Sequence, residues 1–259
     1  MKLCGLLFAA FLLPACAFAR EHQFTGGEPI TVQPDKAYIL VRVSTLQGRQ
    51  LSGTLKAAPL LIRLLSEGEL NQADSLAEKE PHDWLKDVES NVVERPADQP
   101  YAEQNGEEFL LTSVKPGVYV LGGLAMTNWA MPSTGRMVAS FCMGTVKFQA
   151  KPGVVTDLGT LLIVPADAPT TTPELADIVP GKTRGYGPNE YAVAVRPPAQ
   201  STEIPAPLKA LPLVPAAYRA VDAFPNYLGA NLSRLAPMAG VLDYDKDGQI
   251  IDLRSAPVK

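Results

Sequence analysis

The sequence predicts an all-β protein, an antiparallel β-sandwich with a short helical insertion and a proline-rich C-terminal arm. Between Phe109 and Pro165, apolar residues recur at the period of two that is typical of half-buried strands. The same block contains Lys-Pro-Gly-Val twice, at residues 115–118 and 151–154. Proline fixes φ at the first central position of a turn, and glycine accepts the positive φ of a type II turn at the second. Each tetrapeptide is therefore predicted to reverse the chain, through a loop longer than a two-residue hairpin.

Residues 1–19 have the features of a secretory signal peptide. Lys2 precedes an apolar run of 11 residues that ends at Leu13, and Ala17-Phe18-Ala19 forms an A-x-A cleavage site. This run is far shorter than the ~20 residues that span a bilayer, and no later stretch is apolar enough to do so. We expect an exported chain that begins at Arg20, is periplasmic or extracellular, and has no transmembrane span after cleavage.

A second processing outcome remains open. Leu13-Pro14-Ala15-Cys16 resembles a lipobox, which implies lipidation of Cys16 and a membrane-anchored lipoprotein. Proline at the second position departs from the lipobox pattern, so the A-x-A site is favoured. Both outcomes place the protein outside the cytoplasm.

The charge of the chain argues against a nucleic-acid partner, and its cysteine content argues against an intramolecular disulfide. The formal net charge is −4 for the whole chain and −5 without residues 1–19, which contain one lysine and no acid. A mildly acidic chain with scattered basic residues lacks the basic patch of a nucleic-acid binder. Cleavage after Ala19 leaves Cys142 as the one cysteine, so no intramolecular disulfide can form. We interpret Cys142 as a small buried hydrophobe in the middle of a strand.

The sandwich is assigned to residues 29–165, and its strands follow in order. We expect residues 29–33 to form a short edge strand. In residues 35–45, Ile39, Val41 and Val43 share one face, with Tyr38, Leu40 and Arg42 on the other. Residues 58–65 form a strand in which Leu60, Ile62 and Leu64 face the core and Arg63 faces out. In the last strand before the second Lys-Pro-Gly, Val146, Phe148 and Ala150 face the core, with Lys147 and Gln149 in water.

Two stretches interrupt this pattern. Residues 66–108 are polar and contain three prolines, and they predict an insertion with short helices at 71–80 and 81–86. The loop between the strands that end at Met126 and begin near Met137 contains Trp129. We hypothesise that Trp129 contacts a ligand, and the alternative is that it closes one end of the sandwich.

Residues 166–259 form the proline-rich arm. They contain 13 of the chain's 24 prolines, which disfavours long helices and central strands. The arm retains many tyrosines and aliphatic residues, so we expect it to pack on the sandwich. Residues 216–224 predict one or two helical turns, and residues 241–253 predict a closing hairpin.

An acidic motif within that hairpin is the main candidate site. Asp243, Asp245 and Asp247 alternate and are followed by Gly248, which resembles the first half of an EF-hand calcium loop. The twelfth position of such a loop is Arg254, where a bidentate carboxylate is needed, and Asp252 is the nearest substitute. The alternative interpretation is an Asp-Gly turn between two strands.

Enzyme signatures are absent from the sequence. His22 and His82 are the two histidines, and neither lies in a segment that predicts a fixed position. No cluster has zinc-ligand spacing, and no serine lies in a G-x-S-x-G elbow. Gly181-Lys182-Thr183 matches only the end of a phosphate-binding loop, because Ala176 stands at its first glycine.

The run from Phe109 to Leu121, a strand, a Pro-Gly turn and a tyrosine-containing strand, resembles the carboxypeptidase-regulatory-like and prealbumin-like β-sandwiches. The resemblance covers at most residues 29–165, and it implies an Ig-like or prealbumin-like sandwich without catalytic activity. The expected function is that of a cell-envelope binding or structural protein, with an envelope protein or polysaccharide as partner. The alternatives are a divergent secreted hydrolase and a calcium-dependent adhesive domain.

Overall fold

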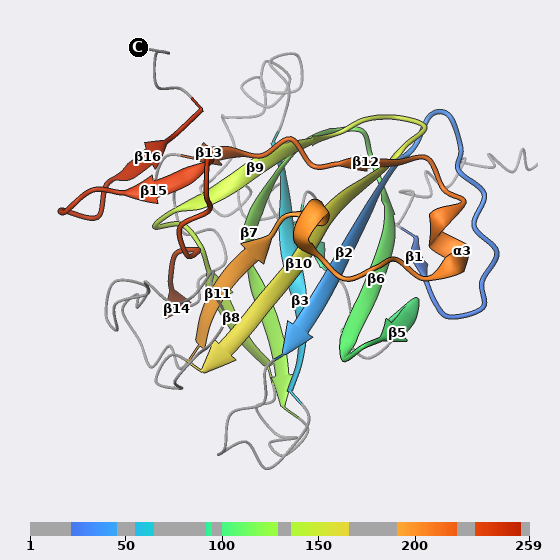
Figure 1. The fold of residues 1–259 in the computed structure, drawn as a ribbon, viewed down its shortest axis with the longest axis horizontal. Coiled ribbons are helices and arrows are strands. Elements are labelled where there is room, and N and C mark those ends of the chain that lie inside the picture. Colours follow the sequence, from blue (N-terminus) through green and yellow to red (C-terminus); the bar gives the residue numbers. More distant parts are fainter. Residues whose placement is uncertain are drawn as a thin grey trace, which may run out of the picture.

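The computed structural model describes residues 22–45, 55–64, 92–94, 100–128, 136–165, 191–221 and 231–254. Within these residues the protein is all-β, as predicted, and helix is limited to the short turns η2 (Pro198–Gln200) and α3 (Ala206–Lys209) (Figure 1). None of the helices in this part of the chain is long and apolar enough to cross a membrane.

The first sheet, sheet A, has the strand order β1-β6-β2-β10-β11. β5 pairs with β6, and β12 pairs with β10 beyond the end of β11. Its strands are β1 (Gln23–Phe24), β2 (Ala37–Thr45), β5 (Ala102–Gln104), β6 (Glu107–Val114), β10 (Val155–Pro165), β11 (Tyr191–Arg196) and β12 (Leu213–Pro215).

The second sheet, sheet B, has the order β13-β9-β7-β3-β4, with β8 alongside β7 and β14 alongside β8. Its strands are β3 (Leu55–Leu64), β4 (Val92–Glu94), β7 (Gly117–Asn128), β8 (Arg136–Ser140), β9 (Thr145–Ala150), β13 (Arg219–Val221) and β14 (Asn231–Leu232). A separate hairpin is formed by β15 (Leu242–Tyr244) and β16 (Ile250–Asp252).

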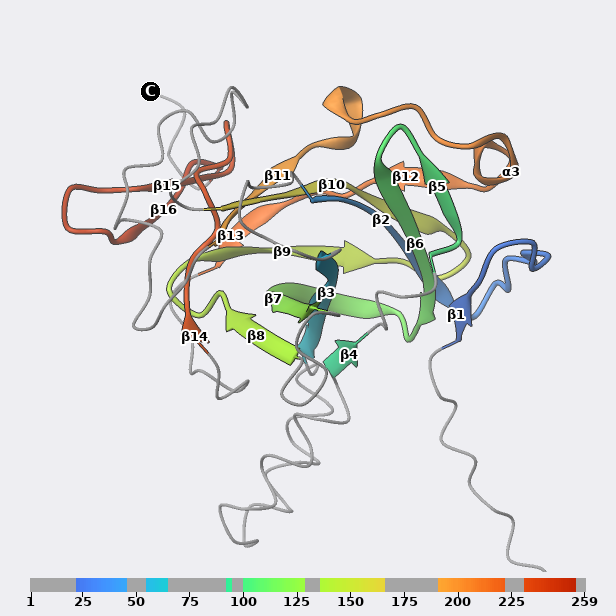
Figure 2. The ribbon, with the colours of Figure 1, turned by 90° about the horizontal axis from the view of Figure 1, so that it is seen from below.

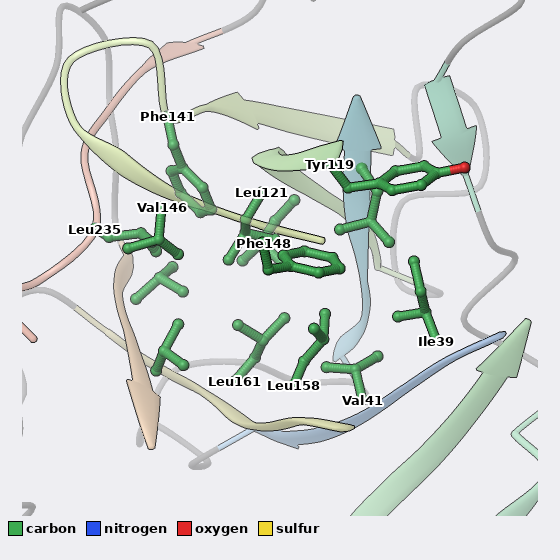
Figure 3. Close-up of a cluster of buried hydrophobic side chains, with 14 of the residues drawn as sticks. Ile39, Val41, Tyr119, Leu121, Phe141, Val146, Phe148, Leu158, Leu161 and Leu235 are labelled. Carbon is green, nitrogen blue, oxygen red and sulfur yellow. The ribbon is translucent and has the colours of Figure 1, made fainter. Parts of the chain in front are cut away.

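The two sheets form two layers with one apolar core between them (Figure 2). Sheet A contributes side chains such as Ile39, Val41 and Leu161, and sheet B contributes Leu121 and Phe148 (Figure 3). Burial of this surface is the main favourable term in folding. It holds the fold together without a disulfide in the described residues, where Cys142 is a free, buried thiol.

The alternation predicted for two strands is confirmed. On β2, Ile39 and Val41 belong to the core between the sheets, whereas Tyr38 and Leu40 belong to a second apolar cluster on the other face. On β9, every second residue from Val146 to Ala150 is buried and Lys147 and Gln149 are exposed.

The outer face of sheet A, the face turned away from sheet B, is buried as well. Its cluster includes Phe24, Tyr38, Leu40, Phe109 and Leu111, and it is covered in part by Leu208 of α3. The segment that leads from β11 to α3 runs along this side of the sheet (Figure 2). Sheet A therefore has apolar packing on both faces, as is usual where a sheet contains parallel strands.

The expectation of purely antiparallel sheets is wrong. β2 pairs with β10 in parallel, and so do β10 with β12 and β8 with β14. A parallel partner must be reached by a long connection, and 109 residues separate the end of β2 from the start of β10. No local pattern specifies such a pairing.

The two Lys-Pro-Gly segments reverse the chain between sheets and not within one. The first joins β6 of sheet A to β7 of sheet B, and the second joins β9 of sheet B to β10 of sheet A. Gly153 has the predicted positive φ of 72°. Gly117 has a φ of 158°, which is nearly extended, because β7 begins at this residue.

Several element boundaries differ from the prediction. β3 begins at Leu55, both of its faces are buried along residues 57–62, and Leu64 is 40% exposed instead of facing the core. Residues 29–33 are not a strand, and the edge strand is β1 instead. The expected helix at 216–224 is wrong, since β13 occupies its described centre and pairs with β9.

The polar insertion at 66–108 is extended where the structure describes it. It contains β4 and β5 and the start of β6. The helices expected at 71–80 and 81–86 lie outside the described residues. After residue 165, the described chain adds β11 and β12 to sheet A, β13 and β14 to sheet B, and finally the hairpin.

Candidate functional site

The acidic motif lies at the tip of the β15–β16 hairpin. Asp245 Oδ1 accepts the backbone N–H groups of Asp247 at 2.9 Å and Gln249 at 2.8 Å. The backbone closes the same turn, with the Gly248 N–H bonded to the Asp245 carbonyl at 3.0 Å and a φ of 80° at Gly248. Asp245 therefore orders an Asp-Gly turn through its own side chain.

The other three carboxylates have separate partners, and Asp243 Oδ1 accepts the backbone N–H of Tyr244 at 2.8 Å. Register pairs Asp252 with Leu242 and Asp243 with Ile251, so Asp243 and Asp252 lie on opposite faces of the hairpin. Asp252 Oδ2 accepts two bonds from Arg219, at 3.0 and 2.5 Å, and Asp247 pairs with Lys246 at 3.1 Å. The Asp252 carboxylate raises the pKa of Arg219 through this hydrogen bond and its charge.

This geometry fits the turn interpretation of the motif. Within the described residues, no group of three or more His, Cys, Asp or Glu side chains is arranged to hold a metal ion. Two hydrogen bonds join the hairpin to residues 234 and 235, which precede it. Arg234 Nη1 donates to the Gly248 carbonyl at 3.2 Å, and the Tyr244 hydroxyl donates to the Leu235 carbonyl at 2.9 Å. The Arg234 guanidinium also lies 4.9 Å from the centre of the Tyr244 ring.

Cys142 and His22 have structural surroundings. Cys142 is 6% exposed, as predicted, but it lies in the turn between β8 and β9 and not within a strand. His22 pairs with Glu28, and the pKa of Glu28 is lowered by the Thr25 backbone N–H and by His22. Outside the described residues lie Cys16, His82, Trp129 and the segment 181–183.

Among the ion pairs of the described residues, the most deeply buried one lies on the outer face of sheet A. Arg42 of β2 binds Asp157 of β10 in a bidentate manner, Nη1 to Oδ1 at 2.7 Å and Nη2 to Oδ2 at 3.1 Å. The two side chains are 2% and 6% exposed. The guanidinium carbon lies 5.6 Å from the centre of the Phe109 ring. Both carboxylate oxygens are thus occupied by an internal partner.

A β-bulge places this pair. Asp157 is aligned with Leu40 and Thr160 with Arg42, so that Leu158 and Gly159 together oppose one residue of β2. The bulge turns Asp157 and Thr160 to the same face, although they are three residues apart. Asp157 Oδ1 also accepts the Gly159 N–H at 2.8 Å, which stabilises the bulge.

The chain crosses the bulge closely where β11 ends. A Cβ atom on Gly159 would lie 2.1 Å from the Arg196 carbonyl oxygen, and the φ of Gly159 is 79°, so both space and conformation require glycine. Ser201 holds this crossing, because its hydroxyl lies 3.0 Å from the carbonyl oxygens of both Arg196 and Pro197 and its single hydrogen is shared between them. We call residues 196–201 the crossing segment.

Tyr218 joins the bulge to the core between the sheets. Its hydroxyl donates to the Leu158 carbonyl at 2.7 Å, and its ring packs edge-on against Phe148 at 6.0 Å. Burial, with a further contribution from the Asp157 charge, raises the pKa of Tyr218 well above its usual range. Tyr218 is therefore a neutral hydrogen-bond donor in the folded protein.

Sequence reasoning missed this pair and the bulge. The one local signal is an arginine within the apolar run of β2, where a buried charge requires a partner. Asp157 lies 115 residues further along the chain, in a strand that looks regular by its pattern. No protein-family model, curated protein or solved structure matches the chain.

Proposed function

We propose that this protein is a non-catalytic binding or structural module of the cell envelope, built on an Ig-like or prealbumin-like β-sandwich. The proposed partner is an envelope protein or polysaccharide. The signal-like residues 1–19 support export, with Cys16 lipidation as the alternative to a free N-terminus at Arg20. The resemblance of residues 109–121 to such sandwiches supports the fold type.

One observation carries the non-catalytic part of the proposal. The bidentate Arg42–Asp157 pair is closed, because both carboxylate oxygens accept bonds from Arg42 and both side chains are shielded from solvent. A general acid or base must reach a proton on a substrate, and a nucleophile must be accessible. These charges hold strands together instead, which is what a rigid scaffold requires.

Exposed apolar side chains support a binding role. Leu64 of β3 and Val118 of β7 are aligned as cross-strand neighbours, and they are 40% and 36% exposed. Ile251 on β16 and Leu253, the residue after β16, are exposed to a similar degree. Exposed apolar side chains that adjoin one another, as Leu64 and Val118 do, are the kind of surface that a partner contacts.

The test is retention of the purified mature protein by separate envelope fractions, one of solubilised membrane proteins and one of cell-wall polysaccharide. We expect the wild-type protein to be retained by one fraction and released by competition with excess unlabelled protein. The matched control is Gly159→Val, which places a side chain against the crossing segment and disrupts the fold at nearly the same composition and charge. Retention of both proteins to the same extent would mean non-specific adhesion.

Two further readouts separate the alternatives. Release of product from ester, glycoside or peptide substrates by the wild-type protein, with no retention by either fraction, would replace the proposal with the hydrolase. Intact mass of the protein from the envelope distinguishes an N-terminus at Arg20 from a lipidated Cys16, because only the second adds the mass of acyl chains.

A further inference from the structure

Five buried side-chain atoms in the described residues lack a hydrogen-bond partner, and three of them lie on one face of one sheet. These three are Arg42 Nε, Glu107 Oε2 and Thr160 Oγ1. Their residues are 1%, 5% and 0% exposed. The other two atoms, in Ser140 and Arg234, lie elsewhere in the protein.

Strand order brings the three residues together. β6, β2 and β10 are adjacent in sheet A, and Arg42 on the central strand is directly aligned with Thr160. Glu107 is aligned with Ser44, two residues along β2 from Arg42, so it is a diagonal neighbour of Arg42. Directly aligned and diagonal neighbours on one face are within reach of long side chains. We call these three residues the outer-face polar cluster.

The cluster is closed off from bulk solvent. The Phe109 ring packs beside the Arg42 guanidinium and is itself fully buried. The crossing segment passes over Gly159, the residue before Thr160. Arg42 keeps its Nη1 and Nη2 atoms on Asp157, and Nε is the nitrogen of its guanidinium that has no hydrogen-bond partner.

The chemistry of the three atoms is complementary to water. Arg42 Nε is a donor, the Glu107 oxygen is an acceptor, and the Thr160 hydroxyl is both. Buried polar groups in native proteins are paired, and an internal water typically makes about three hydrogen bonds to such groups. A water molecule accepts from Nε–H and donates to a carboxylate and to a hydroxyl oxygen.

We propose that the outer-face polar cluster binds an ordered internal water. This water accepts a hydrogen bond from Arg42 Nε and donates hydrogen bonds to Thr160 Oγ1 and Glu107 Oε2. The water extends the Arg42–Asp157 pair into a network across three strands. It makes the Thr160 hydroxyl a necessary part of the network.

Thr160→Val tests the site, because valine keeps the shape of threonine and removes only the hydroxyl. If water is bound, the variant removes the hydrogen bond between the water and the Thr160 hydroxyl. We then expect the Tm to fall by about 2–6 °C, the range for losing one or two hydrogen bonds in a domain of this size. If the hydroxyl has no partner, its removal leaves the Tm unchanged or raises it, which overturns the proposal.

Thr145→Val is the matched control. Thr145 is as buried as Thr160, and its hydroxyl donates directly to the Leu121 carbonyl at 2.6 Å. Its variant must lower the Tm whether or not water occupies the cluster, so it sets the size of a lost hydroxyl bond in this protein.

A second measurement keeps the proposal testable if Thr160→Val does not fold. In the wild-type protein, NMR should show a cross-relaxation peak between the Arg42 Nε–H and a long-lived water, and a high-resolution crystal structure should show solvent density within hydrogen-bond distance of Arg42 Nε and Thr160 Oγ1. A structure in which these atoms bond directly to protein groups, with no solvent between them, overturns it.

Discussion

Replacing Asp157 by asparagine isolates the charge of the buried ion pair. Asparagine has nearly the same shape, and its Oδ1 can still accept from Arg42 Nη1 and from the Gly159 N–H. The change removes the negative charge and replaces Oδ2, which lies 3.1 Å from Arg42 Nη2, with an NH₂ group that can only donate. Arg42 is left buried, charged and facing a second donor.

The magnitude follows from the burial of the pair. Removing one partner of a buried ion pair costs about 3–5 kcal/mol, because the remaining charge has no compensation. In a domain of 150–250 residues, each kcal/mol lowers the Tm by about 2–4 °C, so we expect the Tm of Asp157→Asn to fall by about 6–20 °C. The urea midpoint should fall in proportion, with an unchanged m-value.

Asp252→Asn is the control of the same chemistry at the surface. Its arginine partner, Arg219, has a side chain 46% exposed, and an ion pair in water contributes little. We expect its Tm to stay close to that of the wild-type protein. Adding Arg42→Met to Asp157→Asn should recover part of the lost stability, because it removes the stranded cation. If Asp157→Asn melts no lower than Asp252→Asn, the buried pair does not have the role assigned to it.

Four other outcomes are expected. Gly159→Ala should destabilise the protein by several degrees more than Gly240→Ala, because both glycines have positive φ but only Gly159 has backbone atoms in the way; equal losses would contradict the close crossing. Since the raised pKa of Tyr218 lies above the value of 10.0 for an exposed tyrosine, its contribution to stability is complete below pH 10 and is lost as pH rises further. Urea unfolding at about pH 8 and about pH 11 should therefore show that the free energy of unfolding falls less with pH in Tyr218→Phe than in the wild-type protein. The difference should be up to about 1.4 kcal/mol per pH unit above 10, and an identical fall in both proteins would refute the buried, neutral state of Tyr218. Millimolar calcium should leave the Tm unchanged, since Asp245 is engaged by backbone N–H groups; a rise that Asp245→Asn abolishes would revive the calcium-dependent adhesive domain. A thiol reagent should label Cys142 only after unfolding, and rapid labelling of the native protein would contradict its burial.

The acidic motif shows how far a local pattern reaches. The spacing of Asp243, Asp245 and Asp247 suits both a calcium loop and an Asp-Gly turn. The structure separates the two by the partners of each carboxylate, and Arg219, the partner of Asp252, comes from another strand 33 residues earlier in the chain. Such a partner cannot be inferred from the motif itself.

The sequence by itself determined the features that depend on neighbours along the chain. Alternation placed Ile39, Val41 and Phe148 in the core, and the second Lys-Pro-Gly segment required the positive φ found at Gly153. These features are local, because a strand repeats every two residues and a turn is specified by its own proline and glycine.

Only the tertiary structure decided which strands pair and which side chains share a face. The parallel pairing of β2 with β10 joins segments more than 100 residues apart, and the bulge at Leu158 and Gly159 turns Asp157 and Thr160 to the face of Arg42. A period-two pattern assigns residues three apart to opposite faces, and one inserted residue reverses that assignment. The buried ion pair exists because long-range pairing and the bulge act together, and neither is encoded in a short stretch of sequence.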